Sequence, residues 1–243
     1  MTNGNLRTPG NRNVVITGAG RGLGLGLARC FARRGDHVIG TARSPETAKE
    51  LATVAARVVA LDVTSDVSVA AMANVLADLD HIDVLINNAG INAEAVGAGA
   101  SARGTMDMGR DHFLAVMDVN AAGPMLVTQA CAPLLRGAGG GLVINVSSQL
   151  GAMTFGHEHG NDIAYNASKA ALNMVTVRTA TDLAADHIGI VCIHPGWVRS
   201  DMGGPSASLG VDESASAIAE TVDRLTLADS GHFLRWDGTP HDW

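Results

Sequence analysis

The chain has 243 residues, of which 47% are hydrophobic and 17% charged, and its formal net charge is -7. This composition is typical of a globular protein with enough residues to bury a core. The acidic balance, without a basic block, argues against a nucleic-acid surface. The N-terminus shows no signal-peptide pattern and no apolar run is long enough for a membrane span, so we expect a cytoplasmic protein without membrane contact.

Short apolar runs alternate with helical patterns after a tail at 1–12 that we expect to be disordered. The runs predict strands at 13–17, 37–42, 57–63, 83–90, 141–148, 189–196 and 232–236. A first helix follows the glycines at 18–24, and later helices are predicted near 45–53, 66–79, 110–135, 164–186 and 212–228. Strands that are apolar on both faces and alternate with helices predict one α/β domain over 13–243, with a parallel sheet covered by helices.

One segment departs from the alternation of strands and helices in its composition. Residues 197–211 combine Gly, Pro and Ser with the apolar side chains of Trp197 and Met202. A segment of this kind, following a buried strand, is suited to cover a bound molecule. We expect it to form a substrate lid.

The stretch TGAGRGLG (17–24) lies where the first predicted strand meets the first predicted helix. Gly18, Gly22 and Gly24 have no Cβ, so the backbone there can turn tightly and approach a pyrophosphate. The helix that follows offers free N–H groups and the positive end of its dipole. The spacing is GxxxGxG rather than GxGxxG, but the strand before it and the helix after it favour dinucleotide binding over a purely structural turn.

The end of the second strand indicates which dinucleotide is preferred. A carboxylate there would bind the ribose 2′-hydroxyl of NAD, whereas this strand ends in Gly-Thr-Ala-Arg. Arg21 in the glycine turn and Arg43 after the strand are placed to pair with a 2′-phosphate. Either arginine alone could equally be a solvated surface residue. Together with the missing acid they favour NADP(H) over NAD(H).

The stretch YNASK (165–169) contains the only tyrosine of the chain, four residues before Lys169. On a helix this spacing places Tyr165 and Lys169 on the same face. A neighbouring ammonium favours the ionised phenol, and lowering the phenol pKa to neutrality requires roughly 4 kcal/mol. A phenol adjusted in this way can exchange a proton with the oxygen of a carbonyl or alcohol.

Three further polar residues are candidates for the same site. Ser147 and Ser148 end the fifth strand, and the alternation of side chains points them to opposite faces, so only one can face a substrate. Neither serine lies in a GxSxG pattern, which argues against a hydrolase nucleophile. Asn120 lies inside the predicted helix 110–135, where asparagine is mildly unfavourable, so a functional role is favoured over a solvated one.

A set of motifs along the chain resembles the short-chain dehydrogenase/reductase family. In order they are TGAGRGLG, LDV (61–63), NNAG (87–90), VNAAGP (119–124), NVSSQLG (145–151), YNASKAALN (165–173) and HPGWVRSDM (194–202). The resemblance covers about 13–243, and the C-terminal half is most similar to the subgroup of sniffer-type carbonyl reductases and C-factor proteins. It implies a Rossmann-like, doubly wound parallel β-sheet of about seven strands in the order 3-2-1-4-5-6-7, flanked by helices.

The resemblance also implies roles for single residues. Tyr165 would be the general acid/base, and Lys169 would lower its pKa and bind the nicotinamide ribose. Ser148, which precedes xxG, would orient the substrate carbonyl, and Asn120 would hold a water in a proton relay. The residues implied at the cofactor are Gly18, Arg21, Gly22, Leu23, Gly24, Arg43, Asp62, Val63, Asn88, Ala89, Gly90, Tyr165, Lys169, Pro195, Gly196, Val198 and Ser200.

The substrate pocket is the part of the site that the motifs define least. Ser148 and Tyr165 are 17 positions apart, more than in much of the family, which predicts a longer loop at 152–163 over the site. Trp197 suits either an apolar pocket or an interface, as does Trp243. The candidate pocket residues are Gln149, Phe155, Trp197 and Met202.

Two histidines in this loop, His157 and His159, have a spacing that a zinc site can use. No third ligand is evident, so we favour polar residues at the mouth of the pocket and predict no metal. Cys30, Cys131 and Cys192 are far apart and form no CxxC, which indicates buried thiols in a reducing compartment.

The sequence as a whole predicts an NADP(H)-dependent oxidoreductase that interconverts a small carbonyl compound and its alcohol. Two alternatives stay open: a non-redox or biosynthetic member of the same family, and a dinucleotide-binding signalling protein without turnover. Family members often form a homodimer or homotetramer through the helices that begin near 110 and 164, and monomers also occur.

Overall fold

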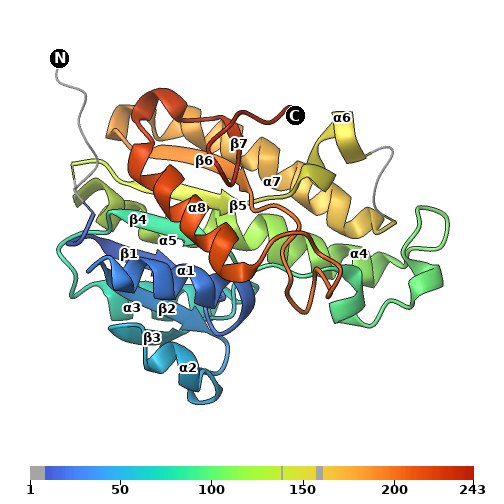
Figure 1. The fold of residues 1–243 in the computed structure, drawn as a ribbon, viewed down its shortest axis with the longest axis horizontal. Helices are drawn as coiled ribbons and strands as arrows, with labels where there is room; N and C mark the ends of the chain where they lie inside the picture. The colour runs from blue at the N-terminus through green and yellow to red at the C-terminus, as the bar shows by residue number, and fades with distance from the viewer. Residues whose placement is uncertain (1–8, 138, 157–160) are drawn as a thin grey trace.

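The computed structural model describes residues 9–137, 139–156 and 161–243. Its centre is a seven-stranded sheet in the order β3-β2-β1-β4-β5-β6-β7 (Figure 1), and every pair of neighbouring strands is parallel. This confirms the predicted Rossmann-like fold. The strands are β1 (Asn13–Ile16), β2 (His37–Ala42), β3 (Arg57–Ala60), β4 (Val84–Asn87), β5 (Leu142–Val146), β6 (Gly189–His194) and β7 (Phe233–Arg235).

Helices cover both faces of the sheet. One face carries α1 (Gly22–Arg33), α2 (Lys49–Ala52) and α8 (Val211–Arg224), and the other carries α3 (Asp66–Leu76), α5 (Gly123–Gly137) and α7 (Ile163–Asp182). Helices α4 (Arg110–Met117) and α6 (Met153–Gly156) lie near the end of the sheet at which the strands finish. Short 3-10 turns are η1 (Pro45–Thr47), η2 (Ala93–Val96), η3 (Ala100–Ala102), η5 (Gln149–Gly151), η6 (Ala184–Asp186) and η7 (Leu227–Asp229). In the described part of the chain, every helix is too short or too polar to cross a membrane.

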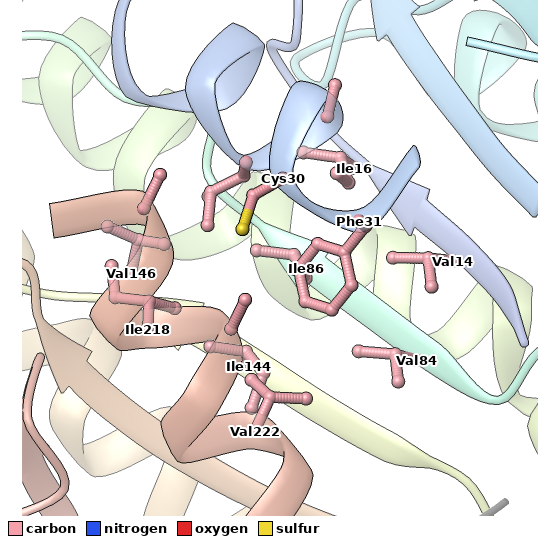
Figure 2. Close-up of a cluster of buried hydrophobic side chains, with 14 of the residues drawn as sticks. Val14, Ile16, Cys30, Phe31, Val84, Ile86, Ile144, Val146, Ile218 and Val222 are labelled. Carbon is pink, nitrogen blue, oxygen red and sulfur yellow. The ribbon is translucent and has the colours of Figure 1, made fainter. Parts of the chain in front are cut away.

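Alternate residues of each strand supply two separate cores. Val14 and Ile16 of β1 pack with Phe31 of α1 and Ile218 of α8, as Figure 2 shows. Val15, between them in sequence, belongs to the core against α3 and α5. Burial on both faces is what a parallel sheet covered by helices requires.

The predicted helix 110–135 is divided into three parts. A π-helical turn, η4 (Asp118–Ala122), separates α4 from α5. An α-helix would need the N–H of residue 124 to reach the carbonyl of Asn120, and Pro124 has no N–H. Gly123 also lies so close to Val63 that an added Cβ would be 2.9 Å from the Val63 Cβ. The prediction of one continuous helix was therefore wrong at this point.

The predicted ends of several other elements also differ. The predicted helix 45–53 consists of η1 followed by the single turn of α2, while α7 and α8 end before η6 and η7 rather than continuing through them. These differences lie at element ends, where helix and turn hydrogen bonds compete closely.

Residues 9–12 do not follow the prediction of a disordered tail. The Asp36 carboxylate accepts hydrogen bonds from the backbone N–H groups of Gly10 (2.9 Å) and Arg12 (3.2 Å). It also forms an ion pair with the Arg12 guanidinium at 2.7 Å, and both side chains are buried. These bonds to the buried carboxylate hold residues 9–12 against the start of β2. Residues 1–8 lie outside the described part.

Candidate active site

The site lies where β4, β5 and β6 end, because parallel strands bring their carboxyl ends to one edge of a sheet. Strand β4 ends at Asn87, and Asn88 follows it. Strand β5 ends at Val146, and the two serines follow it. Helix α7 packs across this edge. The sequence motifs NNAG, NVSSQLG and YNASK therefore meet in space although they are far apart in the chain.

Helix α7 begins at a strong cap. The Asp162 carboxylate accepts hydrogen bonds from the N–H of Tyr165 at 3.0 Å and, through its other oxygen, from the N–H of Ala93 at 2.7 Å. An aspartate at this position satisfies N–H groups that the first helical turn leaves free. The cap thus orients the first turn of α7, which carries Tyr165, and ties it to the loop after β4.

Ser148 and Tyr165 form the centre of the site. The Ser148 hydroxyl lies close enough to the phenol of Tyr165 to lower its pKa by hydrogen bonding, and Ser148 is 7% exposed. The Ser148 hydroxyl also accepts from the N–H of Leu150 at 3.2 Å, which makes it the cap of η5. Two hydroxyls held together in this way can both donate to one oxygen atom of a bound molecule.

Lys169 lies on the same face of α7 as Tyr165, as the spacing predicts. Its Nζ is 5.7 Å from the centre of the Tyr165 ring and donates to the carbonyl of Val146 at 2.8 Å. The side chain is buried, and burial lowers the pKa of the ammonium to about 8. Strand β5 therefore holds the lysine beside the phenol.

The pKa of Tyr165 differs from the expected one. Burial raises the phenol pKa to about 12, and the nearby carboxylate of Asp162 acts in the same direction. The hydrogen bond with Ser148 lowers the pKa but does not outweigh burial. The described residues around Tyr165 thus keep the phenol protonated at neutral pH.

Asn120 is buried, and its side chain binds protein groups. Its Oδ1 accepts from the N–H of Ile91 at 2.8 Å, and its Nδ2 donates to the carbonyl of Ile91 at 2.7 Å and to the hydroxyl of Ser168 at 2.9 Å. The side chain therefore fastens the segment after NNAG to η4 and α7. The carbonyl of Asn120 has no α-helical donor, because Pro124 lacks an N–H.

The glycine turn has the properties of a phosphate-binding turn. Among the described residues, no side chain caps the N-terminus of α1, and its first turn holds no acid. Gly18 and Gly22 have φ values of 63° and 54°, which favour glycine. A Cβ on Gly18 would be 2.9 Å from the Cα of Ala89. The first N–H groups of α1 are thus free of side-chain caps, and the glycines would let an anion come close to the backbone.

The NNAG segment is fastened to this turn. The hydroxyl of Thr17 accepts from the N–H groups of Asn88 and Ala89, both at 3.0 Å. Asn88 in turn donates to the carbonyls of Thr17 (2.9 Å) and Gly18 (3.1 Å). A Cβ on Gly24 would be 2.4 Å from the Gly18 carbonyl, so Gly24 allows this packing.

The two arginines expected at a 2′-phosphate occupy different surroundings. Arg21 is exposed and forms an ion pair with Asp201 of the 197–211 segment. Arg43 is exposed and close enough to Asp62 for its charge to favour the ionised carboxyl. The hydrogen bonds from Thr64 are the main reason why the pKa of Asp62 is low. Arg21 belongs to the glycine turn, and Arg43 follows Ala42, whose Cβ lies 3.6 Å from where a Cβ on Gly20 would be.

The chain beyond β6 returns to the glycine turn. Gly196 has a φ of 81°, and a Cβ there would be 2.2 Å from Leu209, so glycine is required. The backbones of Val198 and Leu209 form an isolated bridge. Ser200 lies 3.8 Å from where a Cβ on Gly22 would stand. The segment 197–211 is thus folded, bonded within itself and adjacent to the glycine turn.

Residues 12–208 match the family model described as short chain dehydrogenase. The chain belongs to this family. It is 36% identical over 162 residues, 67% of this chain and 93% of the relative, to a protein named C-signal from Myxococcus xanthus.

Two solved structures share the fold closely. The carbonyl reductase Sniffer of D. melanogaster has a TM-score of 0.85 at 34% identity and covers 96% of this chain and 99% of its own. An NADPH-bound carbonyl reductase from chicken fatty liver has a TM-score of 0.85 at 32% identity, with the same coverage of 96% and 99%.

Not every implied cofactor residue of this short-chain dehydrogenase presents its side chain to the turn. Val63 is buried in the core with α3 and α5, and Leu23 packs against the core under α1 and α8. Their side chains thus belong to the two cores, and that of Leu23 is half-buried. A Cβ on Gly90 would be 3.3 Å from Asn120 Oδ1 and 3.5 Å from Lys169 Nζ, so Gly90 lies between these two side chains. Pro195 accepts a hydrogen bond from Ser214 at its carbonyl, which fixes the end of β6.

The expected substrate residues lie in different surroundings. Trp197 and Met202 are exposed by 52% and 46%, and the Trp197 indole N–H donates to the carbonyl of Gly203 at 2.8 Å. Gln149 is half-buried in η5. Phe155 packs instead against a small cluster that contains Phe233. Trp197 and Met202 are thus exposed where a substrate could contact them, while Phe155 packs α6 against the cluster that contains Phe233.

The loop histidines, His157 and His159, lie outside the described residues, so their predicted role stays a prediction. In the described ranges, no three His, Cys, Asp or Glu side chains gather where they could hold a metal ion. A hollow of about 600 Å³ lies on the outer face of α4, η4, α5 and α7, and its lining contains none of the candidate catalytic residues. The chemistry is therefore expected at the end of the sheet.

Several residues of this short-chain dehydrogenase site were not assigned from the sequence. Thr17 fastens NNAG, Asp162 caps α7, and Asn173 binds the serine-bearing loop. The aspartate before a helix is a recognisable cap signal. The hydroxyl of Ser147 donates to the Asn173 side chain at 2.6 Å. Both serines therefore contact residues of α7.

Proposed function

We propose that this short-chain dehydrogenase is an NADP(H)-dependent oxidoreductase that interconverts a small carbonyl compound and its alcohol, with Tyr165 as the general acid/base. The observation that carries the proposal is the pair of neighbouring hydroxyls of Ser148 and Tyr165, with the Lys169 ammonium 5.7 Å from the centre of the Tyr165 ring. This cluster lies at the same edge of the sheet as the uncapped N-terminus of α1. A proton donor and a phosphate-binding turn are thus brought to one site.

The hydroxyl pair suits the reduction of a carbonyl. Ser148 and Tyr165 donate to the carbonyl oxygen and so polarise the C=O bond. As a hydride forms the new C–H bond, the π electrons of the carbonyl move to oxygen, which takes the proton of Tyr165. In the reverse direction the phenolate accepts that proton. The high pKa of Tyr165 keeps the donor protonated for reduction at neutral pH.

The residues at the glycine turn fit a dinucleotide. The free N–H groups of α1 suit the pyrophosphate, and Arg21 and Arg43 suit a 2′-phosphate. When bound, NADP(H) supplies or accepts the hydride, and its oxidised ring carries a positive charge that favours the ionised phenol. The similarity to a carbonyl reductase described as NADPH-bound supports this choice of cofactor.

Lys169 and Asn120 suit the return of a proton to Tyr165. Lys169 keeps an ammonium near the ring, and its contact with Val146 leaves further N–H groups for a ribose or water. The carbonyl of Asn120, without its α-helical donor, is the candidate to hold a water of the relay. Asn120 would then act through its backbone, while its side chain fixes the surrounding loop.

A direct assay tests this proposal. Purified protein is mixed with NADPH and a panel of aldehydes and ketones, and the nicotinamide absorbance is followed. We expect turnover with at least one carbonyl, a clear preference for NADPH over NADH, and loss of most activity in Tyr165→Phe. Full activity in Tyr165→Phe would refute the assigned acid/base.

The similarity to a protein named C-signal supports a second candidate function, that of a dinucleotide-binding signalling protein. In that case the chain would bind NADPH without turning it over. Tight binding in a fluorescence titration, together with no turnover across the carbonyl panel, would favour it. A product formed without net consumption of cofactor would instead indicate a non-redox reaction.

The cytoplasmic location and the oligomeric state stay predictions. Leu114 and Met174 are exposed on the face of α4 and α7 that would form a homodimer or homotetramer. Analytical ultracentrifugation of the purified protein distinguishes these states from a monomer.

A further inference from the structure

The segment that carries Ser148 is held on both sides by a single residue of α7. The hydroxyl of Ser147 donates to Asn173 Oδ1 at 2.6 Å. Asn173 Nδ2 donates to the carbonyl of Gly151 at 3.3 Å. We propose that Asn173 is a positioning residue that fixes the Ser148 hydroxyl against Tyr165, an inference that rests on the proposed function.

The position of Asn173 on α7 gives this contact its effect. Asn173 lies two helical turns after Tyr165, on the face that also carries Lys169. The helix is continuous over Ile163–Asp182. Because the phenol and the Asn173 amide share one rigid element, a bond from Asn173 to the serine segment sets the distance between the two hydroxyls.

The backbone of this segment lies directly on α7. A Cβ on Gly151 would be 2.6 Å from the carbonyl carbon of Lys169 and 2.7 Å from the nitrogen of Ala170. Such an approach is open only to glycine. The Asn173 bond to the Gly151 carbonyl therefore acts at the point where segment and helix are in closest contact.

Burial makes the Asn173 contacts hard to replace. Asn173 is 5% exposed and Ser147 is 1% exposed. Water has little access to either group, so loss of the amide leaves buried polar atoms without that partner. The sheet fixes the start of the segment, because the N–H of Ser147 donates to the carbonyl of Ile193 at 2.8 Å. Asn173 supplies the matching restraint beyond Ser148.

The substitution Asn173→Leu removes both bonds while keeping the number of side-chain heavy atoms, and Thr176→Val is its matched control. Thr176 is also buried on α7, and it accepts from Asn145 at 2.8 Å and from the Cys192 thiol at 3.0 Å, not from the serine segment. Both variants lose a buried polar contact between α7 and the sheet. Only Asn173→Leu releases the segment around Ser148.

The single tyrosine of the chain provides a readout that does not need turnover. Tyrosine labelled with ¹³C in its ring gives the NMR signal of Tyr165 alone. Ser148→Ala shows where the signal moves when the hydroxyl contact is lost. We expect Asn173→Leu to move it in the same direction and Thr176→Val to leave it near the wild-type position.

Kinetics supply the second readout. We expect kcat of Asn173→Leu to fall by about 10- to 100-fold because a reacting group is displaced, with little change in KM for NADPH. Thr176→Val should keep kcat within about threefold, since it loses stability but not the position of Ser148.

The outcomes separate this inference from the proposed function. A folded Asn173→Leu protein with the wild-type ring signal would overturn the inference, as would equal effects in Thr176→Val. If Asn173→Leu does not fold, Asn173→Asp keeps the acceptor for Ser147, loses the donor to Gly151, and is judged by the same signal. Wild-type protein without turnover would refute the proposed function, while the ring signal would still test the role of Asn173.

Discussion

The ammonium of Lys169 lies 5.7 Å from the centre of the Tyr165 ring and is hydrogen-bonded to the carbonyl of Val146. The charge is thus held beside the phenol by strand β5. Burial raises the pKa of Tyr165 to about 12 and lowers that of Lys169 to about 8, so burial disfavours the charged form of each. The phenol therefore stays protonated near neutral pH, and Lys169 loses its charge as the pH rises through about 8.

Replacing the charge of Lys169 should shift the pH dependence of alcohol oxidation. Oxidation needs the phenolate, which the ammonium stabilises. The positive ring of bound NADP⁺ would lower the phenol pKa into the range in which Lys169 is still protonated. In that complex Lys169→Met raises the phenol pKa, and the rising limb of kcat should move to higher pH by about one unit or more. Initial rates across a pH series measure this. Lys49→Met, at an exposed lysine, is the control, and an unmoved limb in Lys169→Met would contradict the role of the charge.

Removal of the Asp162 cap should act on stability and on Tyr165 together. Asp162→Ala leaves the N–H groups of Tyr165 and Ala93 without this acceptor, at a cost of about 1–2 kcal/mol in the free energy of unfolding. It also removes a negative charge that raises the phenol pKa, so the oxidation limb should move to lower pH.

A matched cap far from the site separates these two effects. Ser65 caps α3 by accepting from the N–H of Ser68 at 3.3 Å. Ser65→Ala should lower the stability measured by urea unfolding without moving the pH profile. If both variants leave the profile unchanged, Asp162 acts only as a cap.

Arg21 should decide between the two dinucleotides. A guanidinium paired with the 2′-phosphate contributes only to NADPH, so Arg21→Ala should raise KM for NADPH by roughly 10-fold and leave KM for NADH nearly unchanged. Asp201→Asn releases Arg21 from its ion pair and should lower KM for NADPH slightly. Equal changes for both cofactors in Arg21→Ala would place the 2′-phosphate elsewhere.

The Arg12–Asp36 pair should make stability depend on pH. Burial alone raises the pKa of Asp36, but the hydrogen bonds from Arg12 and Gly10 outweigh it, and the pKa lies below its ordinary value. A carboxyl with a lowered folded pKa contributes stability above its unfolded pKa, near 4, and loses it as the pH falls through the folded pKa. Stability from this pair is therefore complete at neutral pH and lost in acid.

Breaking that pair tests its contribution. Arg12→Met leaves a buried carboxylate without its cation, so urea unfolding at pH 7 should show a loss of about 3–5 kcal/mol. The loss should shrink in acid, where the carboxyl of Asp36 is protonated. Arg57→Met, in the exposed pair with Asp78, is the control and should cost much less. Equal losses in the two variants would show that burial of the pair is not decisive.

Much of this protein could be predicted from local patterns. Alternating apolar runs and helical patterns predicted a parallel sheet, and the motif resemblance added its strand order. The spacing of Tyr165 and Lys169 placed them on one helical face, because the period of a helix is the same wherever it packs. The tight turn between β1 and α1 was predicted from its glycines, because residues without a Cβ allow the backbone to turn sharply there.

The tertiary structure decided what depends on contacts between distant segments. Two contacts join segments that are far apart in the chain: the hydrogen bond from Ser147 to Asn173 and the ion pair of Arg21 with Asp201. The burial that raises the pKa of Tyr165 likewise depends on the packing of distant segments around the ring. Even the π-helical turn at Asn120 reflects close packing of Gly123 on Val63 as well as the missing N–H of Pro124. Sequence periodicity specifies which face a side chain occupies. Which atom it meets there follows only from the register of helix against strand, and that register is set by packing across the whole domain.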